Sequence, residues 1–69
     1  MKKDNVTSYD VYRELRDSKG LTDFKVSRDC QITRSTFTDW RHGRSEPKLL
    51  KLAKLAAYFN VPIETFLGK

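Results

Sequence analysis

Every glycine and proline in this chain stands where a helix is expected to begin or to end, and these residues are Gly20, Gly43, Pro47, Pro62 and Gly68. Glycine readily takes the left-handed backbone conformation that ends a helix, and proline fits best in a helix's first turn. Between these residues, large apolar side chains recur three or four positions apart, as on one face of a helix. The pattern predicts an all-α domain of five short helices joined by tight turns, without a linker or a repeat.

Capping residues indicate where the first two helices begin. Thr7 with Asp10 three residues later forms a capping-box pattern, in which each side chain accepts a hydrogen bond from the other residue's backbone. Thr22 is expected to cap a second helix, whose Val26 and Cys30 lie four apart and face inward. The inward face of the first helix is expected to carry Val11, Leu15 and Ser18, with Tyr12 alongside.

The third segment, residues 33–40, fits two types of structure. Its three threonines and two aromatic residues favour a strand by propensity. Its large apolar residues, Phe37 and Trp40, are three apart, however, and alternation of apolar and polar residues is absent. We therefore predict a helix that Thr33 caps and Gly43 ends.

The last two helices are expected to begin at the two prolines. Pro47 would stand in the first turn of the fourth helix, and Asn60 would end it in the left-handed conformation. One face of that helix is expected to carry Leu49, Leu52, Ala56 and Phe59, with Leu55 at its edge. The short last helix, from Pro62 to Gly68, would carry Ile63, Phe66 and Leu67.

Length and composition exclude several classes of protein. A chain of 69 residues predicts one domain over 1–69, with 1–7 as a flexible N-terminal arm. A single cysteine cannot form an internal disulfide, and with a single histidine it cannot form a structural zinc site. The longest stretch without a charge has nine residues, against about 20 for a membrane span. No signal peptide is apparent. We expect a small, soluble protein of a reducing compartment, without a cofactor.

The positive charge is concentrated in one part of the chain. There are 14 lysines and arginines against 9 acidic residues, a formal net charge of +5. Residues 41–54 carry Arg41, Arg44, Lys48, Lys51 and Lys54, with His42 beside them and only Glu46 opposing. A solvated helix face and loop would give this composition. The alternative is a strip that contacts the phosphates of a nucleic acid.

Two stretches, residues 32–47 and 49–68, carry a resemblance to a known family. Counted from Asp23 as the first residue, the fifth is small, and apolar residues stand eighth, tenth, fifteenth and eighteenth. These residues are Ser27, Cys30, Ile32, Phe37 and Trp40. Residues 11–68 thus resemble the helix-turn-helix domain of phage repressors and Cro proteins, often called Xre-like. The resemblance implies a five-helix lambda-repressor-like bundle.

The chain departs from the family's pattern at three positions. Gln31 stands where the turn usually has glycine, so it must accept a positive φ or use another turn. Asp23 stands where a glutamine commonly contacts a DNA phosphate, and a carboxylate would repel one. Arg41 replaces an acidic residue that often pairs with an arginine matching Arg16, so Arg16 needs another partner.

The resemblance implies which side chains contact DNA. In the family, the third helix lies in the major groove with its first residues against the base edges. The residues expected to read bases are Arg34, Ser35, Thr38 and Asp39. Those expected to contact the backbone are Thr22, Thr33, Arg41, His42 and Arg44. A dimer contact is expected from Ile63, Phe66 and Leu67. An arginine can bond guanine O6 and N7 together, and Asp39 could accept from cytosine N4 or orient a basic neighbour.

These features together predict a sequence-specific transcriptional regulator, and the resemblance implies a cytoplasmic repressor of phage, prophage or mobile-element type. It would bind double-stranded DNA as a homodimer on an inverted repeat, without a membrane or small-molecule partner. The alternative is a protein-interaction module, such as an antitoxin-like or anti-repressor-binding partner with the same fold. An enzyme is not expected, since Cys30 faces inward and His42 has no nucleophile or metal ligand beside it.

Overall fold

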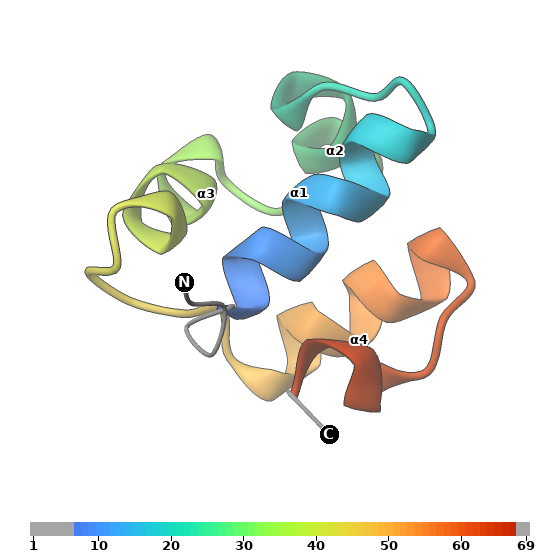
Figure 1. The fold of residues 1–69 in the computed structure, drawn as a ribbon. Helices are drawn as coiled ribbons and strands as arrows, with labels where there is room; N and C mark the ends of the chain where they lie inside the picture. Colours follow the sequence, from blue (N-terminus) through green and yellow to red (C-terminus); the bar gives the residue numbers. More distant parts are fainter. Residues whose placement is uncertain (1–6, 68–69) are drawn as a thin grey trace, which may run out of the picture.

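The computed structural model describes residues 7–67, which form four α-helices followed by one turn of 3-10 helix (Figure 1). The elements are α1 (Ser8–Ser18), α2 (Asp23–Cys30), α3 (Arg34–Arg41), α4 (Leu49–Phe59) and η2 (Ile63–Phe66). The all-α fold is confirmed, and the third segment is indeed a helix that follows Thr33 rather than a strand. In Figure 1, α1 runs through the middle of the molecule, with α2, α3 and α4 around it.

The expected fifth α-helix is replaced by η2. The Thr65 N–H donates to the Pro62 carbonyl at 3.0 Å, and the Leu67 N–H donates to the Glu64 carbonyl at 3.0 Å. Each bond joins an N–H to the carbonyl three residues earlier, as in a 3-10 helix. The segment is too short for a run of the bonds to the fourth preceding residue that form an α-helix. The count of five α-helices was therefore too high by one within residues 7–67. Residues 1–6 of the expected arm lie outside the described residues, as does Gly68.

Local hydrogen bonds confirm the predicted caps at Thr7 and Thr22, whereas Thr33 makes no side-chain cap bond to α3. Thr7 Oγ1 accepts from the Asp10 N–H at 3.2 Å, and an Asp10 carboxylate oxygen accepts from the Thr7 N–H at 3.1 Å. Thr22 Oγ1 accepts from the Lys25 N–H at 3.1 Å. Gln31 ends α2 with φ 58° and ψ 45°, so it takes the left-handed conformation that glycine usually supplies. The tight turn before α3 is therefore made without a glycine.

Aromatic side chains form the centre of the core. Tyr12 has no exposed surface, and its ring lies 5.0 Å from that of Phe37 and 5.2 Å from that of Trp40. Tyr9 is also buried, whereas Val11 and Leu15 are only half-buried and Ser18 is exposed. The predicted inward face of α1 was thus wrong by part of a turn. The tyrosine rings occupy it because large aromatic side chains bury the most apolar area.

The start of α4 also differs from the prediction. Pro47 precedes the helix, since Lys48 is its N-cap and Leu49 its first residue. Leu49 is 63 % exposed and Leu55 is 0 % exposed, so their expected roles are exchanged. The buried face consists of Leu52, Leu55, Ala56 and Phe59. These residues follow the spacing of one helical face, and Leu49 stands in the first turn of the helix, outside this buried set.

Candidate nucleic-acid interface

The outer face of α3 collects the side chains predicted to read bases. Phe37 and Trp40 are buried, which fixes the rotation of the helix about its axis. Arg34, Ser35 and Thr38 are exposed on the opposite side, and Asp39 at its margin is half-buried. The structure therefore brings these four polar side chains to one surface.

Arg34 is the side chain with the longest reach on this surface. No hydrogen bond or ion pair within residues 7–67 engages its guanidinium. Its Cζ lies 5.7 Å from the centre of the Phe24 ring. The N–H groups in the plane of this guanidinium are thus available to an external acceptor.

Threonine and serine hydroxyls surround the first turn of α3. Thr33 Oγ1 lies 2.9 Å from Thr36 Oγ1 and 3.3 Å from Ser35 Oγ, and it makes no side-chain cap bond to the helix. Thr38 Oγ1 donates to the Arg34 carbonyl at 3.4 Å. Because that donation occupies the Thr38 proton, its hydroxyl oxygen is left as an acceptor. At the start of α3 the Thr36 N–H donates to the Thr33 carbonyl at 3.1 Å, while the N–H groups of Arg34 and Ser35 have no partner within residues 7–67.

Asp39 has an intramolecular partner in the loop after α3. The Arg44 guanidinium donates to Asp39 Oδ1 at 3.1 Å, and the Arg44 N–H donates to the Asp39 carbonyl at 2.8 Å. This geometry matches the role in which Asp39 orients a basic neighbour, rather than the role in which it accepts a hydrogen bond from cytosine. Arg44 itself stays exposed.

The basic residues that follow α3 do not form a single strip. Arg41, His42 and Arg44 are exposed together at its C-terminal end. Lys54 instead lines a shallow hollow with Asp29, on the side of the α2–α3 turn. The positive surface next to α3 is thus narrower than the run of charges in residues 41–54 indicates.

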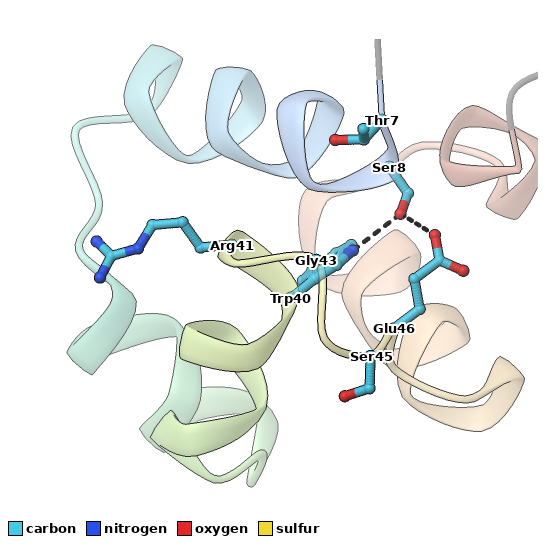
Figure 2. Close-up of a pocket in the computed structure, with 7 residues that line it drawn as sticks. All are labelled: Thr7, Ser8, Trp40, Arg41, Gly43, Ser45 and Glu46. Atoms are coloured by element: carbon cyan, nitrogen blue, oxygen red, sulfur yellow. Dashed lines mark hydrogen bonds between the residues drawn. The ribbon is translucent and has the colours of Figure 1, made fainter. Parts of the chain in front are cut away.

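The loop after α3 is attached to the start of α1 (Figure 2). Trp40 Nε1 donates to Ser8 Oγ at 2.8 Å, and the Ser8 hydroxyl donates to the Glu46 carboxylate. Figure 2 shows these three side chains converging, while the Arg41 side chain points away from them. Glu46, the acidic residue among these basic ones, is therefore directed toward α1. This role of Ser8 could not be predicted from the sequence, because its partners lie more than 30 residues away along the chain.

A protein-family model described as Helix-turn-helix matches residues 13–66. The chain belongs to this helix-turn-helix family. Members of the family are DNA-binding transcription regulators and are not typically enzymes. Neither a search of curated proteins nor a search of solved structures gave a significant match. The helix-turn-helix of this chain is α2, the turn at Gln31 and α3.

The close crossing of α2 and α3 depends on the small side chain at the fifth position of the helix-turn-helix. Ser27 is buried, and its hydroxyl donates to the Phe24 carbonyl at 3.2 Å within its own helix. Cys30 is buried nearby, and burial raises the pKa of its thiol. A buried thiol with a raised pKa is a poor nucleophile, so Cys30 serves as a small core residue.

Asp23, the first residue of the helix-turn-helix, is the partner that Arg16 needed. Its Oδ1 accepts from Arg16 Nη1 at 2.9 Å and from the Tyr12 hydroxyl at 2.5 Å. The position that commonly holds a phosphate-binding glutamine thus carries a structural carboxylate here. Burial, together with the bond to Asp23, raises the pKa of Tyr12 well above its usual range.

This raised pKa predicts a loss of stability in alkali. Above about pH 10 the unfolded chain releases the Tyr12 proton while the folded chain keeps it, so the free energy of unfolding should fall. One such group lowers it by about 1.4 kcal/mol per pH unit. The bond to Asp29 raises the pKa of Tyr58 to about 12, which adds a contribution of the same sign.

Urea unfolding followed by circular dichroism at pH 8, 10 and 11 measures this effect. The Tyr58→Phe variant removes the contribution of Tyr58, so the remaining alkaline slope belongs to Tyr12 and to the buried Cys30 thiol, whose pKa is also raised. A free energy of unfolding that stays constant between pH 10 and 11 would contradict the prediction.

Two further observations concern other classes of site. No helix in the described part of the chain is long and apolar enough to cross a bilayer. Within residues 7–67, no group of three histidine, cysteine or acidic side chains is placed to hold a metal ion.

Proposed function

We propose that this helix-turn-helix protein binds double-stranded DNA at specific sequences and represses transcription, as a regulator of phage, prophage or mobile-element type. The observation that carries the proposal is the exposed face of α3, where the Arg34 guanidinium has no hydrogen-bond or ion-pair partner within residues 7–67. A long cationic side chain on a helix fixed by two buried aromatic residues suits the reading of bases in the major groove.

Base reading is assigned to the residues on this face. Arg34 would donate two hydrogen bonds to O6 and N7 of one guanine. Ser35 and Thr38 are short enough to contact neighbouring bases, and the Thr38 methyl group suits a thymine methyl. Asp39 acts by holding Arg44 rather than by accepting from cytosine, since its Oδ1 accepts from Arg44 at 3.1 Å.

Backbone contacts are assigned to the rim of this face. The N–H groups of Arg34 and Ser35 at the start of α3 have no partner within residues 7–67, and Thr33 adds a hydroxyl there. The remaining candidates are exposed at the start of α2 and after α3: Thr22, Arg41, His42 and Arg44. Phosphate contacts of this type fix the register of the protein on the duplex without carrying sequence information.

The protein is proposed to bind an inverted repeat as a homodimer in the bacterial cytoplasm. Of the three residues assigned to the dimer contact, Leu67 is 46 % exposed, Ile63 is half-buried and Phe66 is 3 % exposed. Phe66 thus belongs to the core, where its ring lies 6.4 Å from that of Trp40. Leu67 is the member of this set with the most surface for a second copy.

Selection of bound sequences from random duplex DNA tests this function. We expect enrichment of a motif repeated with two-fold symmetry, with half-sites about one helical turn apart. Enrichment of a single unrepeated motif would overturn the dimer while keeping sequence-specific binding. The absence of any enriched motif would overturn sequence-specific binding itself.

A second candidate function is a protein-interaction module. Leu49 and Leu50 at the start of α4 are 63 % and 81 % exposed, and apolar side chains of this kind suit a protein partner. If the selection enriches no motif, this candidate is favoured. Exchange of both leucines for serine should then abolish partner binding without unfolding the domain.

A further inference from the structure

Phe24 is a large apolar residue of α2 that the core does not use. It is 55 % exposed, although Val26 and Ser27 beside it are buried. The Cζ atoms of Arg28 and Arg34 each lie 5.7 Å from the centre of its ring. Two cationic side chains therefore meet one exposed aromatic ring on the outer side of the helix-turn-helix.

The two arginines reach this ring from different helices. Arg28 stands four residues after Phe24 in α2, so the two side chains lie on one face of that helix. Arg34 is the first residue of α3. The ring of Phe24 thus connects the two helices outside the core, at the residue to which base reading is assigned.

An aromatic ring can hold an arginine without blocking its donors. A cation is attracted to the face of the ring, and a planar guanidinium stacked there keeps its N–H groups directed outward in its own plane. An unrestrained arginine must lose the freedom of several rotatable bonds when it binds a base. A ring that restricts the side chain beforehand reduces this cost and favours one direction of approach.

We propose that Phe24 is a positioning residue that orients Arg34 toward the base edges, so that the aromatic ring at position 24 sets how strongly the protein discriminates at the base pair that Arg34 reads. The inference rests on the proposed function, because it requires Arg34 to contact a base. It concerns a residue that the helix-turn-helix register assigns to neither the core nor DNA.

The first arm of the test needs no DNA. A guanidinium near a ring face experiences the ring current, so the side-chain proton resonances of Arg34 should be shifted upfield in the wild-type protein. We expect the shift to persist in Phe24→Tyr and to be lost in Phe24→Leu. Phe24 is exposed, so both variants should keep the wild-type circular dichroism spectrum.

The second arm measures discrimination. The dissociation constant is determined for the selected duplex and for one changed at the single base pair that responds to Arg34→Ala. Phe24→Leu should reduce the ratio of the two constants about two- to five-fold, the value of an exposed cation–π contact, and Phe24→Tyr should retain it. Arg28→Ala is the matched control, since it removes a cation from the same ring and should leave the ratio unchanged.

A double-mutant cycle separates positioning from a general structural effect. In an Arg34→Ala background, Phe24→Leu should have no further effect on the ratio. An equal effect in both backgrounds, or an unchanged ratio in Phe24→Leu alone, overturns the inference and leaves the proposed function standing. If Arg34→Ala does not change base preference, Arg34 does not read a base, and the inference falls with that assignment. The resonance shift then still shows whether the ring holds Arg34.

Discussion

The Arg34→Ala variant is expected to bind its preferred duplex about 5- to 150-fold more weakly, while binding to unrelated duplexes changes little. A bidentate contact from arginine to guanine discriminates by about 1–3 kcal/mol, which corresponds to this range. Arg34 has no intramolecular hydrogen bond or ion pair within residues 7–67, so its removal leaves no buried group without a partner. Equilibrium titration of the selected duplex and of duplexes with single base-pair changes measures the effect.

Arg44→Ala provides the contrasting variant. Its guanidinium is exposed beyond the end of α3 and is held by Asp39 at 3.1 Å. As a phosphate contact it should weaken all duplexes alike and reduce the dependence of log K on log salt concentration by about one. The assignment is reversed if Arg44→Ala alters base preference and Arg34→Ala weakens all duplexes equally.

The elements that the sequence predicted correctly are those whose causes are local. The caps at Thr7 and Thr22 need only a backbone N–H three residues away. Gln31 and Asn60 both have positive φ, at the two positions where the pattern required a helix to end. In each case the deciding contact lies within a few residues, so the pattern alone contains it.

The errors occur where distant parts of the chain decide the structure. The loop before α4 is bonded through Glu46 to Ser8, 38 residues earlier, and the helix then begins at Leu49 rather than at Pro47. Leu49 in the first turn of α4 is exposed, whereas Leu55 in the middle of the helix is buried. Spacing within one helix could not predict a start that a tertiary contact helps to fix.

In the candidate site too, the features with local causes could be predicted and the contacts between helices could not. The exposed face of α3 follows from Phe37 and Trp40, whose three-residue spacing defines the opposite, buried face. The contact of Phe24 with Arg34 joins two helices and could not be read from either one. The sequence offered one signal: Phe24 is a large apolar residue outside the positions expected to form the core.

The Tyr12→Ala variant is expected to be largely unfolded at 25 °C. Removing a large buried aromatic side chain costs about 3–5 kcal/mol, and a domain of this size has a total stability of only a few kcal/mol. Tyr12 has no exposed surface and lies near the rings of Phe37, Trp40 and Phe59. Circular dichroism at 222 nm, with and without urea, measures the loss. A urea midpoint close to that of the wild type would contradict it.

Tyr12→Phe separates the ring from its hydroxyl. This variant keeps the aromatic contacts but removes the donor to Asp23, whose Oδ1 still accepts from Arg16 at 2.9 Å. The cost should be about 1.5–3 kcal/mol, as for a hydrogen bond to a charged group. Because phenylalanine has no proton to release, the part of the alkaline destabilisation that belongs to Tyr12 should disappear as well. A Tyr12→Phe protein that retains the full alkaline slope would show that other groups cause it, even if its stability at pH 8 falls as expected.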